Sequence, residues 1–339
     1  MFNKYYEKIK KFMKENIQGL LFYLVFIVTL TYPLPYYIST GGGVIDTTNR
    51  VEIENEYDSN GTLNFLYVSQ LRATIPTFLL AKILPTWDLE SISSYQISQD
   101  ESMEELQIRD KLYLEEANTS AILVAYNSAS KEIKIHNKNN HITYLVDKTK
   151  TNLKIGDVLL SVDGIEVDNI ESVREVVANK NVGDKLALKV LRDKKEINCY
   201  AEVFLENGEK YIGISFLTTY DYDLKPNLEL KFKNNESGPS GGLMLALTIY
   251  DKLTSEDITK GLKIAGTGTI DINGNVGQIG GVKYKLRGAV KNKMDLMLVA
   301  NGENYEECMK LKEEEDLDIE IIGVSTFEEA LNALKNYEK

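Results

Sequence analysis

Residues 16–45 contain no charged side chain, and their centre, residues 20–30, is almost wholly apolar. An apolar stretch of about 20 residues is long enough to cross a bilayer as a helix. Lysines cluster just before this stretch, and basic residues favour the cytoplasmic side of a membrane. We therefore expect a cytoplasmic basic tail at 1–18, a transmembrane helix at 19–38, and the remainder of the chain on the extracytoplasmic side.

A cleaved signal peptide is the alternative to this anchor. It would need a shorter apolar core and a small-residue cleavage site, for which Ser39-Thr40-Gly41 is the one weak candidate. Pro33 and Pro35 should end the helix near the outer interface. No second stretch of comparable length follows, so we expect a single-pass protein of the cell membrane and prefer a retained anchor.

Charge and the scarcity of cysteine and histidine exclude several kinds of partner. The 339 residues carry a net charge of −12 and no basic stripe interleaved with aromatic residues, so nucleic acid is not an expected partner. Cys199, Cys308, His136 and His141 lack the spacing of a zinc or redox motif. We expect no metal and no cofactor, and two buried thiols rather than a disulfide.

Residues 39–115 should form a membrane-proximal region of hairpin and helix. Alternating residues at 51–57, a turn at Asn60-Gly61 and a second run at 63–68 indicate a β-hairpin. Further elements are expected as helices at 73–83 and 102–117, a strand at 121–126, and a polar loop or hairpin at 127–141.

A Gly156-Asp157 turn leads into a buried strand that ends in a tight Asp163-Gly164 hairpin. An amphipathic helix at 169–179 and an alternating strand at 186–191 follow. This order resembles the C-terminal two-thirds of a PDZ domain. The resemblance implies a β-rich domain at 116–204.

PDZ domains hold a peptide C-terminus in a Gly-Leu-Gly-Phe-type loop and add the peptide as a strand beside a helix. No such loop is visible between Ser120 and Ile133. Two interpretations therefore stay open. Either the domain binds peptide in its groove, or it only positions the neighbouring domain or a substrate.

Two glycine-rich segments carry the candidate chemistry. Gly238-Pro239-Ser240-Gly241-Gly242 places a serine on a tight turn before an apolar helix, and Gly280-Gly281 precedes Lys285. A serine hydroxyl becomes a good nucleophile only when a neighbouring base removes its proton. The turn matches the G-x-S-x-G string of α/β-hydrolases, whose histidine base follows the serine, but no histidine follows Ser240. A lysine base is therefore the economical interpretation.

A lysine can act as a base only when it is neutral. Lowering its pKa from about 10.4 to about 7 or 8 means destabilising the charged form by roughly 4 kcal/mol, through burial and nearby positive potential. A helix that begins near Val282 supplies both, because its N-terminal end is positive and its neighbours are apolar. On such a helix Lys285 shares a side with Val282 and Ala289, whereas Lys283 is rotated about 200° away toward solvent.

Three motifs together resemble the C-terminal proteolytic domain of Lon, a Ser-Lys dyad peptidase, over about residues 205–339. They are the turn at 238–242, the Thr-Gly strand end at 267–270 and the glycine-rich segment at 274–285. One departure is Asn235-Glu236-Ser237, where Lon tends to have Lys-Asp. The Ser237 hydroxyl is therefore a rival to the serine on the turn.

By this resemblance Ser240 is the nucleophile, Lys285 is the general base, and Thr267 helps to orient the lysine. The backbone amide of Ser240 and one from the preceding turn would form the oxyanion hole. The resemblance also gives a supporting role to three residues that shape the turn, Gly238, Pro239 and Gly241.

An anchor, a PDZ-like module and a Lon-type domain in this order resemble the membrane-anchored PDZ-Lon serine proteases of Gram-positive bacteria, in peptidase family S16. No G-x-x-x-x-G-K-[ST] phosphate loop occurs in the sequence. The resemblance implies an α+β multidomain chain and an extracytoplasmic, ATP-independent endopeptidase that acts on extended or loosely folded segments. The alternative is a non-catalytic, PDZ-containing membrane scaffold with a degenerate protease domain. Cleavage preference and homo-oligomerisation stay open.

Overall fold

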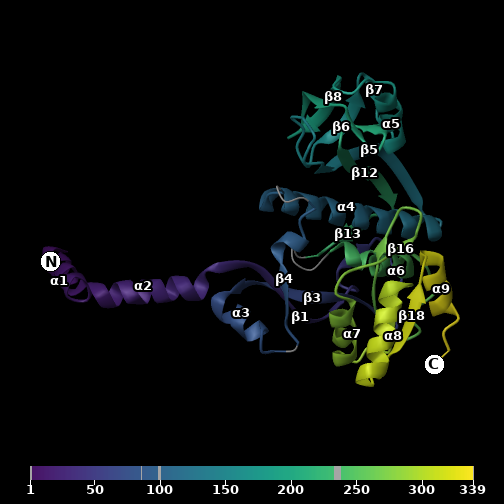
Figure 1. Ribbon diagram of the computed structural model, residues 1–339. Helices are drawn as coiled ribbons and strands as arrows, with labels where there is room; N and C mark the ends of the chain where they lie inside the picture. Colours follow the sequence, from purple (N-terminus) through teal and green to yellow (C-terminus); the bar gives the residue numbers. More distant parts are fainter. Residues whose placement is uncertain (1, 85, 98–100, 233–237, 339) are drawn as a thin grey trace. The chain divides into compact units, whose positions relative to one another are not determined.

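The computed structural model describes residues 2–84, 86–97, 101–232 and 238–338 (Figure 1). The chain divides into two compact units. The smaller unit combines Met1–Gly41 with Ser69–Tyr95, and the larger combines Gly42–Val68 with Gln96–Lys339. Two long strands, β1 (Pro33–Asp46) and β3 (Thr62–Thr74), contribute residues to both units.

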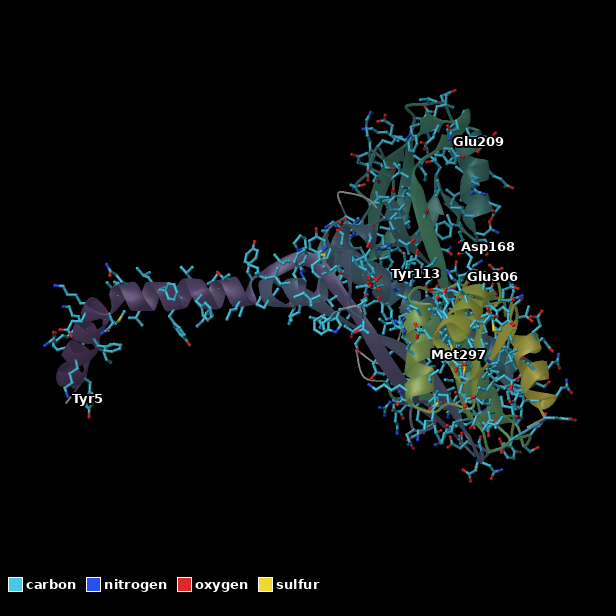
Figure 2. All side chains as sticks on the ribbon, turned by 60° about the horizontal axis from the view of Figure 1, so that its bottom comes forward. Tyr5, Tyr113, Asp168, Glu209, Met297 and Glu306 are labelled. Atoms are coloured by element: carbon cyan, nitrogen blue, oxygen red, sulfur yellow. The ribbon has the colours of Figure 1, made fainter. Side chains whose placement is uncertain are left out.

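The smaller unit begins with two helices, α1 (Phe2–Glu15) and α2 (Ile17–Thr31). No residue of α2 is buried, and side chains such as Tyr5 on α1 project outward (Figure 2). The helix ends at Thr31 rather than at residue 38, because Tyr32 adopts an extended conformation and Pro33 begins a strand. Among the described residues no single helix is long and apolar enough to span a membrane, but Tyr5–Glu15 and Ile17–Thr31 meet the criteria as a pair bent by 77°.

The rest of the smaller unit is a short sheet with one helix. Strand β1 pairs in antiparallel fashion with β4, joining Ile38 to Leu89. Ile38, Ala73 and Ala81 form the buried core. The remaining elements are α3 (Ile75–Ala81), β4 (Asp88–Ser91) and the 3-10 turn η1 (Ile92–Ser94).

Residues 132–225 of the larger unit form a β-rich domain. Its sheet has the order β12-β5-β6-β8-β9, with β7 paired to β6, and its core includes Ile142, Leu159 and Leu188. Its elements are β5 (Glu132–Leu145), β6 (Val158–Val162), β7 (Ile165–Glu166), α5 (Ile170–Ala178), β8 (Lys185–Arg192), β9 (Lys195–Glu202), β10 (Phe204–Glu206), β11 (Glu209–Tyr211) and β12 (Ile214–Lys225). The strands and helix predicted between residues 156 and 191 are confirmed.

The C-terminal part of the larger unit is a layered α/β structure. Strand β14 (Lys263–Thr267) pairs in parallel with β3 on one side and with β17 (Leu296–Ala300) on the other, and β17 pairs in parallel with β18 (Glu320–Val324). The remaining elements are α4 (Met103–Ser128), β13 (Leu228–Leu230), η2 (Pro239–Gly241), α6 (Gly242–Leu253), β15 (Thr269–Ile270), β16 (Val276–Gly277), α7 (Val282–Lys291), α8 (Glu303–Glu315) and α9 (Phe327–Lys335).

Side-chain alternation along the parallel strands divides this sheet into two buried faces. Ile264 and Leu298 belong to the core that includes α4, α6 and α9. Ala265 and Met297, one position away on the same strands, belong to the core that includes α7 and α8. Successive residues of a strand point to opposite faces, so each strand supplies both cores. The carboxyl end of β14 therefore lies between helices from two layers.

The hairpin predicted at 51–68 is wrong. The residues of β2 (Val51–Ile53) pair with β13, and β3 pairs in parallel with β14, about two hundred residues further along the chain. An alternating pattern predicts a strand and its buried face, but it does not identify the partner. Residues 42–68 belong to the larger unit, whereas residues 69–95 belong to the smaller one.

Two further predictions between residues 121 and 141 are wrong. The expected strand at 121–126 is part of the continuous helix α4, which ends at Ser128. The segment 127–141, expected as a loop or hairpin, contains most of β5, which pairs with β12. Every residue from Ala121 to Tyr126 is buried. A helix that is buried on all sides loses its amphipathic period, so a short apolar run of this kind cannot be distinguished from a strand.

Candidate active site

Ser240 lies on η2, the 3-10 turn that leads into α6. Pro239 occupies the first position of this turn, where its missing backbone N–H costs no hydrogen bond. The Gly241 amide donates to the Gly238 carbonyl over 3.0 Å. Every residue of α6 is buried, which fixes the turn at the end of a rigid element.

Backbone hydrogen bonds hold this turn against the end of β14. The Gly268 amide donates to the Ser240 carbonyl over 2.9 Å, and the Leu243 amide donates to the Gly268 carbonyl over 3.1 Å. A Cβ atom on Gly242 would lie 2.9 Å from Cγ2 of Ile270 and 3.0 Å from its backbone nitrogen. Glycine at position 242 is therefore what allows the helix to approach β15 so closely.

Lys285 reaches Ser240 from the opposite layer. It lies in the first turn of α7, which begins after Gly281, a residue with φ of 69°. Its Nζ atom donates to Ser240 Oγ over 2.8 Å and to Thr267 Oγ1 over 2.8 Å. The residue is 3% exposed, and this burial lowers the pKa of Lys285 to about 8. The positive end of α7 disfavours the charged amine in the same direction.

Thr267 occupies the last position of β14 and is completely buried. Its hydroxyl donates to the Ser240 carbonyl over 3.0 Å, so its own proton is engaged there. The oxygen then accepts an N–H of Lys285. These contacts fix two directions around the Lys285 nitrogen, one toward Thr267 Oγ1 and one toward Ser240 Oγ.

The structure also places the other residues that the sequence singled out. Lys283 is half-buried rather than solvated, and its ammonium lies 4.9 Å from the centre of the Tyr284 ring. Ser237, the rival hydroxyl, lies outside the described residues. The two thiols are free and buried, as predicted, at Cys199 and Cys308.

The remaining turn glycines differ in how tightly they are surrounded. A Cβ atom on Gly238 would meet nothing within 4 Å, whereas one on Gly241 would lie 3.3 Å from the Phe65 ring. Phe65 in turn stacks on Phe232, with ring centroids 5.2 Å apart. Sequence reasoning missed both aromatic residues, because the predicted hairpin places the strand that carries Phe65 in another region.

His136 and His141 both lie on β5 and not in this site. His136 pairs with Asp223 on the neighbouring strand over 2.6 Å. The Nε2 atom of His141 lies 3.0 Å from Thr219 Oγ1, and burial lowers the pKa of His141. In the described parts of the chain, no group of three or more His, Cys, Asp or Glu side chains is arranged to hold a metal ion.

A second glycine-containing connection, Ile212-Gly213, joins β11 to β12. Gly213 has φ of 67°, and a Cβ atom there would lie 2.0 Å from Thr149 Oγ1. The connection directly precedes β12, the last strand in the sheet order, and its neighbour Lys210 donates to the Ala178 carbonyl at the end of α5.

Comparisons with known proteins agree with these domains. The family described as PDZ domain matches residues 122–203, and the family described as Lon protease (S16) C-terminal proteolytic domain matches residues 234–336. Lon protease 2 of Borreliella burgdorferi is 26% identical over 215 residues, which cover 59% of this chain and 25% of that protein. The Lon protease of Azorhizobium caulinodans is 33% identical over 97 residues, which cover 29% of this chain and 11% of that protein.

This chain thus spans a quarter or less of the length of these curated relatives. Among solved structures, the PDZ domain of an SdrC-like protein from Listeria monocytogenes matches with 18% identity and a TM-score of 0.22. The match covers 25% of this chain and 93% of that one.

Proposed function

Since this chain is a PDZ-Lon protein of peptidase family S16, we propose that it is a membrane-anchored, ATP-independent serine endopeptidase with a Ser240–Lys285 dyad. The matched proteolytic domain and the Lon-named relatives support a serine peptidase. The observation that carries the dyad is the 2.8 Å contact between Lys285 Nζ and Ser240 Oγ, made by a lysine whose pKa burial lowers to about 8.

In this mechanism the neutral Lys285 amine accepts the Ser240 proton as Oγ attacks the carbonyl carbon of the scissile bond. The resulting lysine ammonium gives that proton to the leaving amine, and the acyl group stays on Oγ. Lys285 then accepts a proton from water, whose oxygen attacks the ester carbonyl, and returns the proton to Oγ. Thr267 keeps the amine aimed at Oγ throughout, because its hydroxyl accepts a second N–H of Lys285.

The negative charge that develops on the substrate oxygen needs donors that are already in place. We assign this role to the Ser240 amide. It lies where η2 meets the first turn of α6, and the positive end of that helix stabilises an oxyanion.

Membrane anchoring belongs to the same proposal. The uncharged helix α2 follows a basic first helix, which favours a cytoplasmic N-terminus and a catalytic domain on the extracytoplasmic side. Substrates would then be secreted or surface peptides, or loosely folded proteins. If the full chain is recovered in the soluble fraction rather than in detergent-extracted membranes, this part of the proposal fails.

The test of the peptidase proposal uses the full chain in detergent with casein as an unstructured substrate and no nucleotide. We expect turnover by the wild type and none above background by Ser240→Ala or Lys285→Met, because each removes one half of the dyad. Lys283→Met is the matched control and should keep its activity, since its amine lies over Tyr284 rather than at Ser240. Full turnover by Lys285→Met would refute the dyad.

Labelling with a fluorophosphonate probe separates this proposal from the scaffold alternative. The probe should react with the wild type and not with Ser240→Ala. If the wild type is left unlabelled between about pH 7 and pH 10, where a lysine with a pKa of about 8 becomes neutral, the non-catalytic scaffold is the better description.

A further inference from the structure

Helix α1 gathers its apolar side chains on one face. Tyr5, Tyr6, Ile9, Phe12 and Met13 follow the three- and four-residue spacing that places side chains on the same side of a helix. They are 52–64% exposed, and Figure 2 labels the first of them. The described part of the chain therefore leaves this apolar face largely uncovered, although it contains three aromatic rings.

The rest of the surface of α1 is basic. The helix contains five lysines and two glutamates, although the whole chain carries a net charge of −12. At about 100° per residue, Lys8 and Lys10 border the apolar face on its two sides, and Lys11 and Lys14 lie further round. The Lys10 ammonium lies 5.9 Å from the centre of the Tyr6 ring, at one edge of the apolar face. A lysine-rich side opposite an aromatic and aliphatic side is typical of helices that lie in a membrane interface.

A bend at Asn16 turns α1 across the axis of α2. The two helices meet at an angle of 77°, and Figure 1 shows this bend near the N-terminus. Asn16 has φ of −115°, and its side-chain amide donates to the Phe12 carbonyl over 2.9 Å, as its backbone amide does over 3.0 Å. A side chain that enters the backbone hydrogen-bond ladder is a known cause of a kink. With α2 across the bilayer, this bend places α1 close to the plane of the membrane surface.

The length of α2 favours the same arrangement. Its 15 residues span about 22 Å at 1.5 Å per residue, whereas the hydrocarbon core of a bilayer is about 30 Å thick. The shortfall is therefore about 8 Å. An interfacial helix buries its apolar face by about 5–10 Å. A docked α1 would thus supply apolar side chains at the depth that α2 does not reach.

Charge and connection select a lipid surface over other occupants of the apolar face. Two copies of α1 packed through this face would bring lysines together along both edges, and like charges oppose such packing. Only Asn16 separates α1 from α2, so α1 stays beside any bilayer that holds α2. The anionic lipids of a cytoplasmic leaflet attract lysines next to a transmembrane helix.

We propose that α1 is a lipid-binding helix that docks in the plane of the anionic cytoplasmic leaflet. Its apolar face enters the boundary between headgroups and acyl chains, and its lysines contact the anionic headgroups. The inference rests on the membrane anchoring in the proposed function and names a partner, an anionic phospholipid surface, that a spanning helix alone does not require. It does not depend on peptidase activity.

The test reads the depth of two positions of α1 in the full chain, inserted in vesicles. Trp87 is the only tryptophan of the sequence, so Trp87→Phe removes the background emission. In this background Ile9→Trp places a probe at the centre of the apolar face, and Glu7→Trp places one about 200° away on the polar side. Every chain also carries Ser240→Ala, so that no proteolysis affects the result.

The vesicles contain phosphatidylcholine brominated in its acyl chains, mixed with either phosphatidylglycerol or the same share of unbrominated phosphatidylcholine. Bromine quenches only a tryptophan that enters the bilayer. We expect the Ile9→Trp probe in phosphatidylglycerol vesicles to be quenched about threefold more than the Glu7→Trp probe, and more than in neutral vesicles. No quenching of the Ile9→Trp probe, or equal quenching at the two positions, would overturn an in-plane helix. Equal quenching in both kinds of vesicle would overturn the preference for anionic lipid.

Charge variants test the contact with the headgroups. In the Ile9→Trp chain, Lys10→Gln/Lys14→Gln should lower quenching about twofold or more, because each lysine near an anionic surface strengthens binding about fivefold. Lys194→Gln/Lys195→Gln makes the same change at two exposed lysines of the β-rich domain and is the matched control, with quenching expected to stay the same. Circular dichroism checks folding. An equal loss of quenching in both double variants would contradict a specific role of the α1 lysines.

Flotation of the vesicles distinguishes this inference from the proposed anchor. In about 1 M salt, where charges are screened beyond about 3 Å, a chain held by α2 should still float with the vesicles. If the chain is left behind in high salt while the Ile9→Trp probe is quenched in low salt, α1 binds lipid and the anchor fails. If the chain floats and the probe is not quenched, the anchor stands and this inference fails. A dimer in sedimentation with an unquenched probe would assign the apolar face to a second copy of the chain.

Discussion

The amine of Lys285 is almost completely buried, and this burial controls its protonation. Desolvation is what lowers its pKa, so the residue can lose its proton under mild conditions without a charged neighbour to expel it. Thr267 then decides where the lone pair points, because its hydroxyl accepts one amine hydrogen and donates its own to the Ser240 carbonyl. Burial thus sets the pKa of Lys285, and the hydrogen bond to Thr267 sets the direction in which the Lys285 amine points.

The first prediction concerns pH. A base must be unprotonated, so kcat/KM should increase as pH rises and reach half its maximum near the pKa of Lys285, about 8. A titration of kcat/KM for a short peptide between about pH 6 and pH 10 measures this. Thr267→Val should lower kcat and move the midpoint, because it removes an acceptor of the amine, whereas Thr267→Ser should restore both. A profile that is flat across this range would contradict a lysine base.

The second prediction concerns stability. A pKa lowered from 10.5 to about 8 means that, between those values, the unfolded chain binds a proton that the folded chain does not. The free energy of unfolding therefore rises with pH across this window, and below pH 8 the buried amine costs about 3 kcal/mol, at about 1.4 kcal/mol per pH unit. Lys285→Met should remove this cost and unfold at higher urea concentration at pH 7.

The comparison of wild type and Lys285→Met should be repeated near pH 10.5, where the advantage of the variant is expected to vanish. Lys283→Met serves as the control, since its side chain is half-buried over an aromatic ring. A Lys285→Met protein that is less stable than the wild type at pH 7 would show that the hydrogen bonds of the amine outweigh its desolvation.

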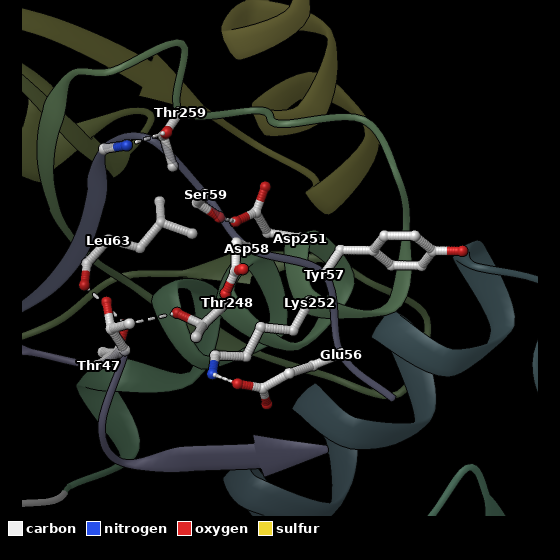
Figure 3. Close-up of a pocket in the computed structure, with 12 residues that line it drawn as sticks. Thr47, Glu56, Tyr57, Asp58, Ser59, Leu63, Thr248, Asp251, Lys252 and Thr259 are labelled. Atoms are coloured by element: carbon white, nitrogen blue, oxygen red, sulfur yellow. Dashed lines mark hydrogen bonds and ion pairs between the residues drawn. The ribbon is translucent and has the colours of Figure 1, made fainter. Parts of the chain in front are cut away.

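Helix α6 connects the active site to a second polar cluster deeper in the larger unit, drawn in Figure 3. Thr248 lies 2.7 Å from Thr47 and donates to the Met244 carbonyl over 2.8 Å. One helical turn on, Asp251 accepts a hydrogen bond from Ser59, and Lys252 pairs with Glu56 over 2.8 Å. These contacts tie the segment before the PDZ domain to α6, the helix that follows the turn of Ser240.

The third prediction follows from this cluster. Thr248→Val keeps the shape of the side chain but leaves the Thr47 hydroxyl without this neighbour in a buried site. The Thr47 hydroxyl still donates to the Leu63 carbonyl over 2.6 Å, so one neutral hydrogen bond is lost and no group is left unsatisfied. Such a bond is worth about 0.5–1.5 kcal/mol, and the urea midpoint should fall by a corresponding amount. KM for the short peptide should stay the same, because the dyad is untouched. An unchanged midpoint would mean that water replaces the lost partner.

How much the sequence predicts depends on how local each interaction is. The turn at Ser240, the helix start before Lys285 and the choice of Lys285 over Lys283 all depend on neighbouring residues, and the structure places these groups together. The pairing of β3 with β14 depends on residues two hundred positions apart, and no local pattern encodes it. The contact between Phe65 and the turn at Gly241 therefore cannot be predicted from the sequence around either residue.

Two of the hydrophobic cores in the larger unit contain one thiol each, so alkylation can follow the opening of each core separately. Cys199 lies in the core of the PDZ domain and Cys308 in the core beside α7 and α8. Burial raises the pKa of both thiols, that of Cys308 to about 12. Neither should react with an alkylating agent at pH 7 in native buffer, because the thiolate is the nucleophile and neither group is accessible.

Mass spectrometry of alkylated peptides measures this fourth prediction. As urea increases, Cys199 should become labelled when the PDZ core opens and Cys308 when the core beside α7 and α8 opens, so the two sites report the order in which these cores unfold. Rapid labelling of Cys308 in native buffer would contradict its place in a closed core.

The parallel strands of the catalytic sheet come from both sides of the PDZ domain in sequence, with β3 before it and β14, β17 and β18 after it. During synthesis β3 can pair with β14 only after residue 267 has been added. Ser240 can contact Lys285 only after residue 285 has been added. Contacts this distant in sequence form late, after loop-closure entropy has been overcome. A chain that stops before β14 and α7 therefore lacks both the strand that pairs with β3 and the lysine proposed as the base of Ser240. The proposed dyad can therefore assemble only after Lys285 has been synthesised.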